Sequence, residues 1–300
     1  MRHVSNRSIW LVALVCVAVT ATATAPAAQT PAASGKSFLW TVHRGENLLY
    51  LAGSVHALNE DVYPLSTAFE SAFAAAGTLV EEIDLGTADA TLAPILLSKG
   101  LYLDGRRFDT VVSPETATLV TARLEASGLP VQMFQTMKPW MVMLTLSALE
   151  AQRAGLDPNL GLDKHFFDRA TAAGKTIVGL ETAESQLDRL DAIPDAIQEQ
   201  LLRSTLNELD TIQASLQTLI TSWQRGDVAA IEELLLGSFD GYPAAYTSLI
   251  VERNRNWMPQ IEACLARSRP CMVVVGAAHL VGPDGLLAEL RGRGYRIEQQ

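Results

Sequence analysis

MVVVGAAHLV, residues 272–281, contains the most strongly hydrophobic strand-like run of the chain, and a glycine followed by a histidine ends that run. Its first four residues include no polar side chain, which is typical of a strand covered on both faces. LYLAGSVHAL, residues 49–58, has the same pattern near the other end of the chain. We expect the two segments to lie in one sheet, so that His56 and His279 converge beyond the carboxyl ends of their strands.

Further strands are predicted around these two. Residues 37–53 contain two apolar runs on either side of RGEN, which is the pattern of a β-hairpin. GTLVEEIDL (77–85) and GKTIVGLET (174–182) each have a β-branched apolar centre and glycines, and we interpret both as strands. Residues 285–299 predict a helix, a glycine stop and an edge strand.

The middle of the chain is predicted to be helical. A helix is expected to follow Ser113, a favourable N-cap, with a proline in its first turn and an end near Gly128. In residues 200–225, large apolar side chains recur every seven positions and are expected to pack on a neighbouring helix. The predicted fold class is α/β (α+β-like), with a central sheet built from N- and C-terminal strands. Residues 38–300 would form a single domain with a helical insertion over about 113–268.

The charge of the chain disfavours nucleic acids and anionic membranes as binding partners. The 300 residues carry a formal net charge of -10 at pH 7, and lysine and arginine do not cluster. The chain therefore lacks the basic surface that nucleic-acid binding requires. An anionic membrane surface is disfavoured as a partner for the same reason.

The first residues have the pattern of a targeting segment. Residues 1–25 combine two arginines, a short apolar run and small residues, so we interpret them as a cleaved signal peptide. The alternative, a membrane anchor, needs about 20 apolar residues, roughly twice the length of this run. Residues 26–37 are rich in Pro, Ala and Ser and are interpreted as a flexible linker. The protein is thus expected to be periplasmic or secreted, with no stable membrane insertion after cleavage.

The expected export affects the oxidation state of the two cysteines that lie outside the signal peptide. Cys264 and Cys271 would be in an oxidising compartment, where a disulfide between them is possible. Metal ligation by this pair is disfavoured because neither a CxxC motif nor a nearby histidine accompanies it.

The two histidines suggest metal chemistry if a third ligand joins them. Neutral imidazole is a common ligand of divalent transition metals, so Mn, Co, Fe or Zn is expected. VEEID supplies two carboxylates, and strand alternation places Glu82 and Glu81 on opposite faces. One would bind the metal, and the other could accept a proton from water. The alternative is an edge strand whose glutamates are simply hydrated.

Taken together, these motifs resemble the TraB/GumN family, which is related to the Tiki metalloproteases. The resemblance covers nearly the whole chain after the linker. It is carried by LYLAGSVHAL, LVEEIDL, GLDKHFFDRATAAGKTIVGLETAESQL, ERNRNWMPQI and VVVGAAHLVGPDGLLAELRGRGYRIE. In that family the paired GxxH motifs and a strand glutamate are the proposed metal and catalytic residues. The resemblance therefore implies that His56, His279 and Glu82 hold the metal.

The resemblance implies roles for other residues as well. Arg253 and Asn254 match the family's Arg-Asn pair and are expected at the catalytic centre, together with Glu81. Glu181 and Gln186 match the family's LET…Q segment, and Glu181 is expected to contact substrate. Ser54 stands where the family's first motif usually has Thr; it keeps the hydroxyl and is also expected to contact substrate.

The function expected from the sequence is metal-dependent hydrolysis of a peptide or protein substrate outside the cytoplasm. The alternative is a binding module that sequesters a peptide, haem or metal in the same cleft without turnover. Fold resemblance does not separate the two, because one fold hosts both activities.

Overall fold

A computed structural model describes residues 35–300, apart from the side chains of residues 89 and 90. In this part of the chain six strands form one mixed sheet in the order β4-β3-β5-β2-β1-β6. The strands are β1 (Leu39–Arg44), β2 (Asn47–Ser54), β3 (Thr78–Ile83), β4 (Thr176–Glu181), β5 (Cys271–Gly276) and β6 (Arg296–Gln299). All six strands lie where the sequence predicts them.

The centre of the sheet is β5, which pairs in parallel with β2 on one side and β3 on the other. Its six residues are all buried. A strand in this position is covered on both faces, which explains its continuous apolar sequence. The expectation that strands from the two ends of the chain meet in one sheet is confirmed.

The predicted hairpin is formed by β1 and β2. Their register pairs Arg44 with Asn47 across a two-residue turn, and Gly45 has a φ of 62° that favours glycine. On its other side β1 pairs antiparallel with β6. The Ser37 amide donates to the Gln300 carbonyl, so the two ends of the described chain are joined.

Thirteen α-helices are described between and after these strands. They are α1 (Thr67–Ala75), α2 (Leu85–Gly100), α3 (Phe108–Val111), α4 (Pro114–Ala126), α5 (Pro139–Arg153), α6 (Leu162–Ala172), α7 (Ala183–Asp191), α8 (Asp195–Glu208), α9 (Ile212–Gln224), α10 (Val228–Leu236), α11 (Pro243–Tyr246), α12 (Glu252–Cys264) and α13 (Leu286–Gly292). Short helical segments are η1 (Glu60–Val62), η2 (Val131–Phe134), η3 (Pro158–Leu160), η4 (Gly237–Phe239), the π-helix η5 (Thr247–Val251) and η6 (Ala277–His279). Ser113 caps α4 as expected, because its side chain accepts from the Thr116 amide.

The seven-residue stripe in residues 200–225 spans two helices, α8 and α9, which are separated at residues 209–211. Its four main members are all buried, namely Leu202, Leu209, Leu216 and Trp223. The stripe therefore forms one continuous apolar surface, although the helix is interrupted between α8 and α9. The region 113–268 also contains β4, which forms one edge of the sheet.

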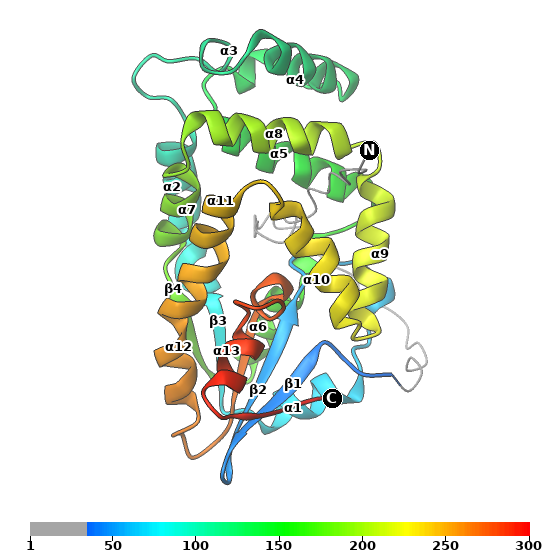
Figure 1. The fold of residues 1–300 in the computed structure, drawn as a ribbon, viewed down its shortest axis with the longest axis vertical. Coiled ribbons are helices and arrows are strands. Elements are labelled where there is room, and N and C mark those ends of the chain that lie inside the picture. Colours follow the sequence, from blue (N-terminus) through cyan, green and yellow to red (C-terminus); the bar gives the residue numbers. More distant parts are fainter. Residues whose placement is uncertain (1–34) are drawn as a thin grey trace.

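The helices cover both faces of the sheet and extend beyond its carboxyl edge. In Figure 1, α3, α4, α5 and α8 lie above the end to which the β2 arrow points. Helix α6 packs against β3, β4 and β5, and α12 packs against β4. The carboxyl ends of β2, β3 and β5 therefore lie below this helical region.

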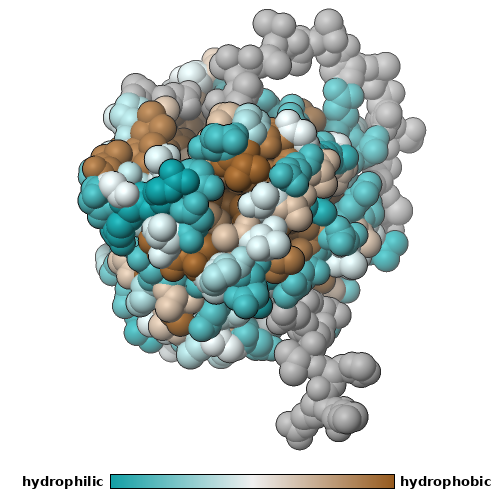
Figure 2. All heavy atoms as spheres, turned by 90° about the horizontal axis from the view of Figure 1, so that it is seen from above, coloured by the Kyte–Doolittle hydropathy of each residue, from teal (hydrophilic) through white to brown (hydrophobic). Residues whose placement is uncertain are grey.

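The surface seen from above is mixed. Apolar side chains lie on it in separate groups among hydrophilic ones (Figure 2). Among the described residues, four large apolar side chains are exposed, namely Leu97, Leu103, Leu119 and Met133. Within residues 35–300, each helix is too short or too polar to cross a membrane.

Cys264, at the end of α12, and Cys271, at the start of β5, form a disulfide with Cα atoms 5.8 Å apart. The expected signal peptide and most of the expected linker lie outside the described residues. Ser37, the last residue of that linker, is buried, and its hydroxyl hydrogen-bonds Ser66 at 2.7 Å.

Candidate active site

Three ionisable side chains converge at the carboxyl edge of the sheet. His56 follows β2, Glu82 lies near the end of β3, and His279 ends η6 directly after β5. Nε2 of His56 lies 3.9 Å from Glu82 Oε1, and Nε2 of His279 lies 4.0 Å from the same oxygen. All three side chains are buried. The parallel pairing of β2 and β3 with β5 brings together residues that are distant in the sequence.

Asn254 fixes the orientation and tautomer of His279. The Asn254 Nδ2 group donates to the carbonyls of His279 and Asp284, at 3.1 Å and 2.9 Å. Its Oδ1 therefore accepts from His279 Nδ1, 2.7 Å away. Nδ1 carries the hydrogen of the neutral ring. Nε2 therefore carries a lone pair, which faces the centre of the cluster.

Asp163 holds His56 in a similar way. Its Oδ1 lies 3.1 Å from His56 Nδ1 and also accepts from the Ser54 hydroxyl at 2.9 Å. Asp163 lies in the first turn of α6, whose N-terminus is close to His56: a Cβ at Gly161 would be 2.3 Å from the His56 carbonyl oxygen. Only glycine allows this close approach.

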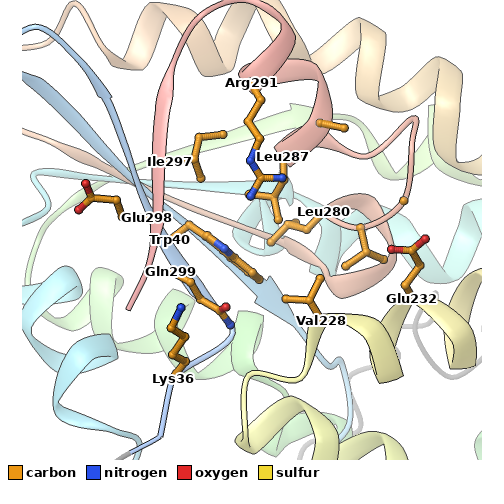
Figure 3. A pocket seen from close by; sticks show the side chains of 13 residues that line it. Lys36, Trp40, Val228, Glu232, Leu280, Leu287, Arg291, Ile297, Glu298 and Gln299 are labelled. Carbon is orange, nitrogen blue, oxygen red and sulfur yellow. The ribbon is translucent and has the colours of Figure 1, made fainter.

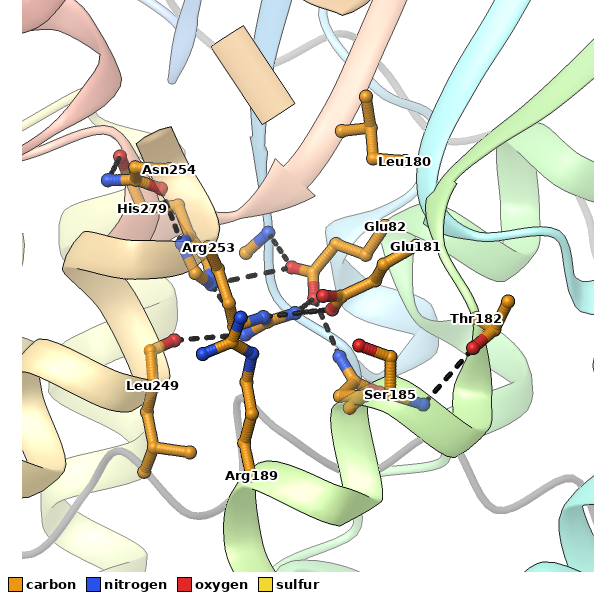
Figure 4. A network of polar contacts seen from close by, with 12 residues as sticks. Glu82, Leu180, Glu181, Thr182, Ser185, Arg189, Leu249, Arg253, Asn254 and His279 are labelled. Carbon is orange, nitrogen blue, oxygen red and sulfur yellow. Dashed lines mark hydrogen bonds and ion pairs between the residues drawn. The ribbon is translucent and has the colours of Figure 1, made fainter. Parts of the chain in front are cut away.

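Arg253 joins the cluster from α12, immediately after the π-helical turn η5 (Figure 4). Its Nη1 lies 2.9 Å from His279 Nε2, and its Nη2 donates to Glu82 Oε2. Glu181 binds Arg253 twice, at Nε (2.8 Å) and Nη2 (2.6 Å). The guanidinium also lies 4.6 Å from the centre of the Trp257 ring. Arg253 is only 1% exposed, so these contacts act in a dry environment where they are strong.

The charges of the cluster determine its protonation. Burial and the Arg253 charge lower the pKa of His279 to about 3, so this ring is neutral at pH 7. Burial would raise the pKa of Glu82, but Arg253, the two histidines and the Gly276 amide lower it to about 2. Burial also lowers the pKa of His56, but the charge and hydrogen bond of Asp163 outweigh it and raise that pKa.

Gly276, the last residue of β5, leaves the space in which these groups meet. Its amide donates to Glu82 Oε1 at 2.7 Å. A Cβ at this position would lie 3.1 Å from Glu82 Oε1 and 3.3 Å from His56 Nε2. The glycine of the second GxxH motif is therefore part of the site itself.

The other predicted site residues fall into two groups. Ser54, Glu181 and Asn254 contact the cluster, but each holds another side chain, namely Asp163, Arg253 or His279. The substrate contacts expected of Ser54 and Glu181 do not follow from these positions, because both side chains are turned inward. Glu81 does not join the cluster.

Glu81 lies on the opposite face of β3, and both of its carboxylate oxygens are buried without a partner among the described residues. Burial and the charges of Asp163, Asp84 and Asp168 raise its pKa well above the usual range. The strand itself is interior, between β4 and β5, so the alternative of hydrated edge-strand glutamates is wrong.

Asp163 was not assigned from the sequence, and Gln186 was matched only to the family's LET…Q segment, without a role. Asp163 lies in GLDKHFF, and Gln186 lies on α7, where its Nε2 donates to Glu82 Oε2 at 2.9 Å. An acidic residue in the first turn of a helix is usually interpreted as dipole stabilisation. Only the three-dimensional contact with His56 distinguishes Asp163 from that role.

The donor set fits a divalent transition metal in its chemistry. Two ligands at ~2.1 Å from one ion lie at most ~4.2 Å apart, and both histidine–Glu82 separations are within that limit. Both rings are held at Nδ1, as metal-binding histidines usually are. In the present arrangement, however, residues 35–300 contain no ready metal-binding group of three His, Cys, Asp or Glu. The lone pair of His279 instead accepts from Arg253, which would have to release it.

Comparison with known proteins supports a relationship over the whole described domain. A sequence model described as the TraB/PrgY/gumN family matches residues 38–299. The uncharacterized protein YbaP of Escherichia coli K12 is 28% identical over 247 residues, which cover 82% of this chain and 89% of YbaP. YbaP of Shigella flexneri matches with the same identity and coverage. No solved structure gives a significant match.

Proposed function

This chain belongs to the TraB/PrgY/gumN family, and from its buried cluster we propose that it is a metal-dependent hydrolase of peptide or amide bonds. The observation that carries the proposal is that both histidine Nε2 atoms lie within 4.0 Å of one Glu82 oxygen. Each ring is held at Nδ1 by a residue that presents its Nε2 to the cluster. This arrangement matches metal-binding histidines, whose partners fix the tautomer.

In the proposed enzyme His56, His279 and Glu82 hold the ion, with Mn, Co, Fe or Zn as the candidates. A divalent ion there would lower the pKa of a bound water and polarise a substrate carbonyl. Asp163 and Asn254 position the two rings. The backbone amide of Gly276 and the side chain of Gln186 hold Glu82.

Arg253 is proposed to stabilise negative charge on the substrate. Its two contacts with Glu181 do not involve His279, so they can keep the guanidinium in place when the His279 lone pair is released. A fixed, buried cation stabilises a developing oxyanion or a peptide carboxylate strongly.

A second candidate is a binding module without turnover. It is favoured by the contact of Arg253 with His279 Nε2, because this contact closes the cluster with a cation in place of an open metal position. Such a module would hold a peptide, haem or metal by displacing Arg253.

The proposed location is the periplasm or the exterior of the cell. The signal-like sequence of residues 1–25 supports it, and so does the disulfide between Cys264 and Cys271, which is a bond of oxidising compartments.

The test combines metal content with cleavage on the same sample. The protein is purified without chelator, its metal is measured by elemental analysis, and cleavage of a mixed peptide library is followed by mass spectrometry. His279→Ala is compared with wild type, and His43→Gln on β1 is the matched histidine control.

Near-stoichiometric metal and cleavage that are both lost in His279→Ala and both kept in His43→Gln would support the hydrolase. Bound metal without cleavage would favour the binding module. If the folded wild type binds none of the four metals and cleaves no peptide, the hydrolase proposal is wrong.

A further inference from the structure

A second cavity lies on the far side of the turn that follows His279. It has a volume of about 620 Å³, within the range of ~300–1,000 Å³ that is typical of small-molecule pockets. It is enclosed by β1, β6, α10, α13 and residues 280–282 (Figure 3). It shares no lining residue with the histidine cluster, and the proposed function leaves it without a role.

The floor of the cavity is apolar. Trp40, Leu280 and Leu287 are almost completely buried in the fold and still line the cavity. Ile297 and Val228 complete this surface at its sides. Because these three floor residues are at most 3% exposed, the apolar surface that a ligand can cover is provided mainly by Val228 and Ile297, which are partly exposed.

The rim carries charges of both signs that have no partner. Arg291 extends from α13 into the cavity. Glu232, on α10, lies on the other side of Leu280 (Figure 3). Within residues 35–300, neither of them, nor Lys36 at the lower rim, makes an ion pair or a side-chain hydrogen bond.

Neighbouring charges on the same elements are neutralised. Arg293, also on or beside α13, binds Glu262 at 2.9 Å and Glu289 at 2.6 Å. Glu298 lies 3.4 Å from Arg296. Within residues 35–300, Arg291 and Glu232 thus line the cavity as a cation and a carboxylate without an ion-pair partner.

We propose that this cavity binds a short apolar peptide with free termini. The peptide carboxylate pairs with Arg291, and the terminal ammonium pairs with Glu232. The apolar side chains cover Val228 and Ile297, the partly exposed apolar residues of the lining. A charged group on each side and an apolar surface between them complement a zwitterion with an apolar body, whereas a purely anionic amphiphile would leave Glu232 unpaired.

The test uses the tripeptide Leu-Ala-Leu, its N-acetyl form and its C-terminal amide, titrated calorimetrically into the full chain. Each cap removes one charge, so we expect each to weaken binding to wild type about tenfold. In Arg291→Ala the amide and the free acid should bind equally. In Glu232→Gln the N-acetyl peptide and the peptide with a free amine should bind equally. Mass spectrometry after each titration verifies that the peptide stays intact.

Arg293→Ala is the matched control, because it removes an arginine beside the same helix that does not line the cavity; both cap penalties should persist in it. Arg291→Lys keeps the charge and should keep part of the carboxylate penalty. The proposal is overturned if wild type binds no peptide at millimolar concentration. It is equally overturned if the caps cost nothing, or if their penalties persist in the two cavity variants.

Discussion

His56 and His279 are each held at Nδ1 by one side chain, and those contacts determine which nitrogen faces the cluster. The two histidines could be found from the sequence because each follows an apolar strand and a glycine. Glu82 could be found because a charge inside such a strand requires a partner. Asp163 could not be found, since its contact with His56 depends on where the N-terminus of α6 lies relative to β2.

Asp163→Asn tests this positioning role. The amide cannot supply the carboxylate charge that increases the basicity of His56, so metal affinity should fall about 10–100-fold. Affinity is measured by competition with a chromophoric chelator. Asp168→Asn is the control, because the exposed Asp168 lies on the same helix and pairs with Lys164. Equal affinity in the two variants would contradict the role of Asp163.

His165 lies on α6 outside the cluster, and its protonation makes the stability of the protein depend on pH. Burial and then the charge of Arg169 lower its pKa to about 4 in the folded protein, from 6.5 as its usual value. As pH falls from 6.5 to 4, the unfolded chain gains a proton that the folded chain resists. Its contribution to stability is therefore complete above pH 6.5 and is lost towards pH 4.

His165→Gln should remove this dependence. Between pH 7 and pH 5 the free energy of unfolding of wild type should fall by up to about 2 kcal/mol more than that of the variant. Urea unfolding at the two pH values measures the difference, with His43→Gln as the control. The same pH dependence in His165→Gln and wild type would show that this histidine titrates normally.

At the scale of elements, the sequence predicted where strands and helices occur better than where they end. Residues 200–225 read as one helix because the apolar repeat continues across the break between α8 and α9. Periodicity records which side chains are buried, and two successive helices on the same core preserve it. The strand expected at 174–182 was correct, because short apolar runs between glycines favour strands.

The disulfide connects two such elements, α12 and β5. It closes a loop with a sequence separation of 7, so its loss should lower the free energy of unfolding by about 2 kcal/mol. Guanidinium unfolding with and without dithiothreitol measures this effect. The double variant Cys264→Ala and Cys271→Ala should be insensitive to the reductant. A wild type that is equally insensitive would mean that the bond does not stabilise the protein.

At the scale of the whole molecule, the sequence indicated a sheet built from both ends of the chain but not its strand order. Parallel neighbours are joined by long crossovers, so local sequence does not specify which strands are adjacent. The order places β5 between β2 and β3, and β6 at an edge. These two C-terminal strands should therefore have very different effects when they are removed.

A chain that ends at residue 268 should not unfold cooperatively, because β2 and β3 lose the strand that joins them. A chain that ends at Tyr295 lacks only the edge strand β6 and should still fold, with lower stability. Thermal unfolding followed by circular dichroism distinguishes the two. A cooperative transition in the shorter chain would mean that the remaining strands pair without β5.

The central position of β5 also sets the time at which the protein becomes functional during biosynthesis. The ribosome makes β5 after β1, β2, β3 and β4, although β5 lies between β2 and β3 in the sheet. Folding of the N-terminal part during synthesis can therefore bury helices, but it cannot bring His279 to His56 and Glu82. The cluster can form only after residues 271–279 have been synthesised, so a nascent chain that stops before them lacks the site.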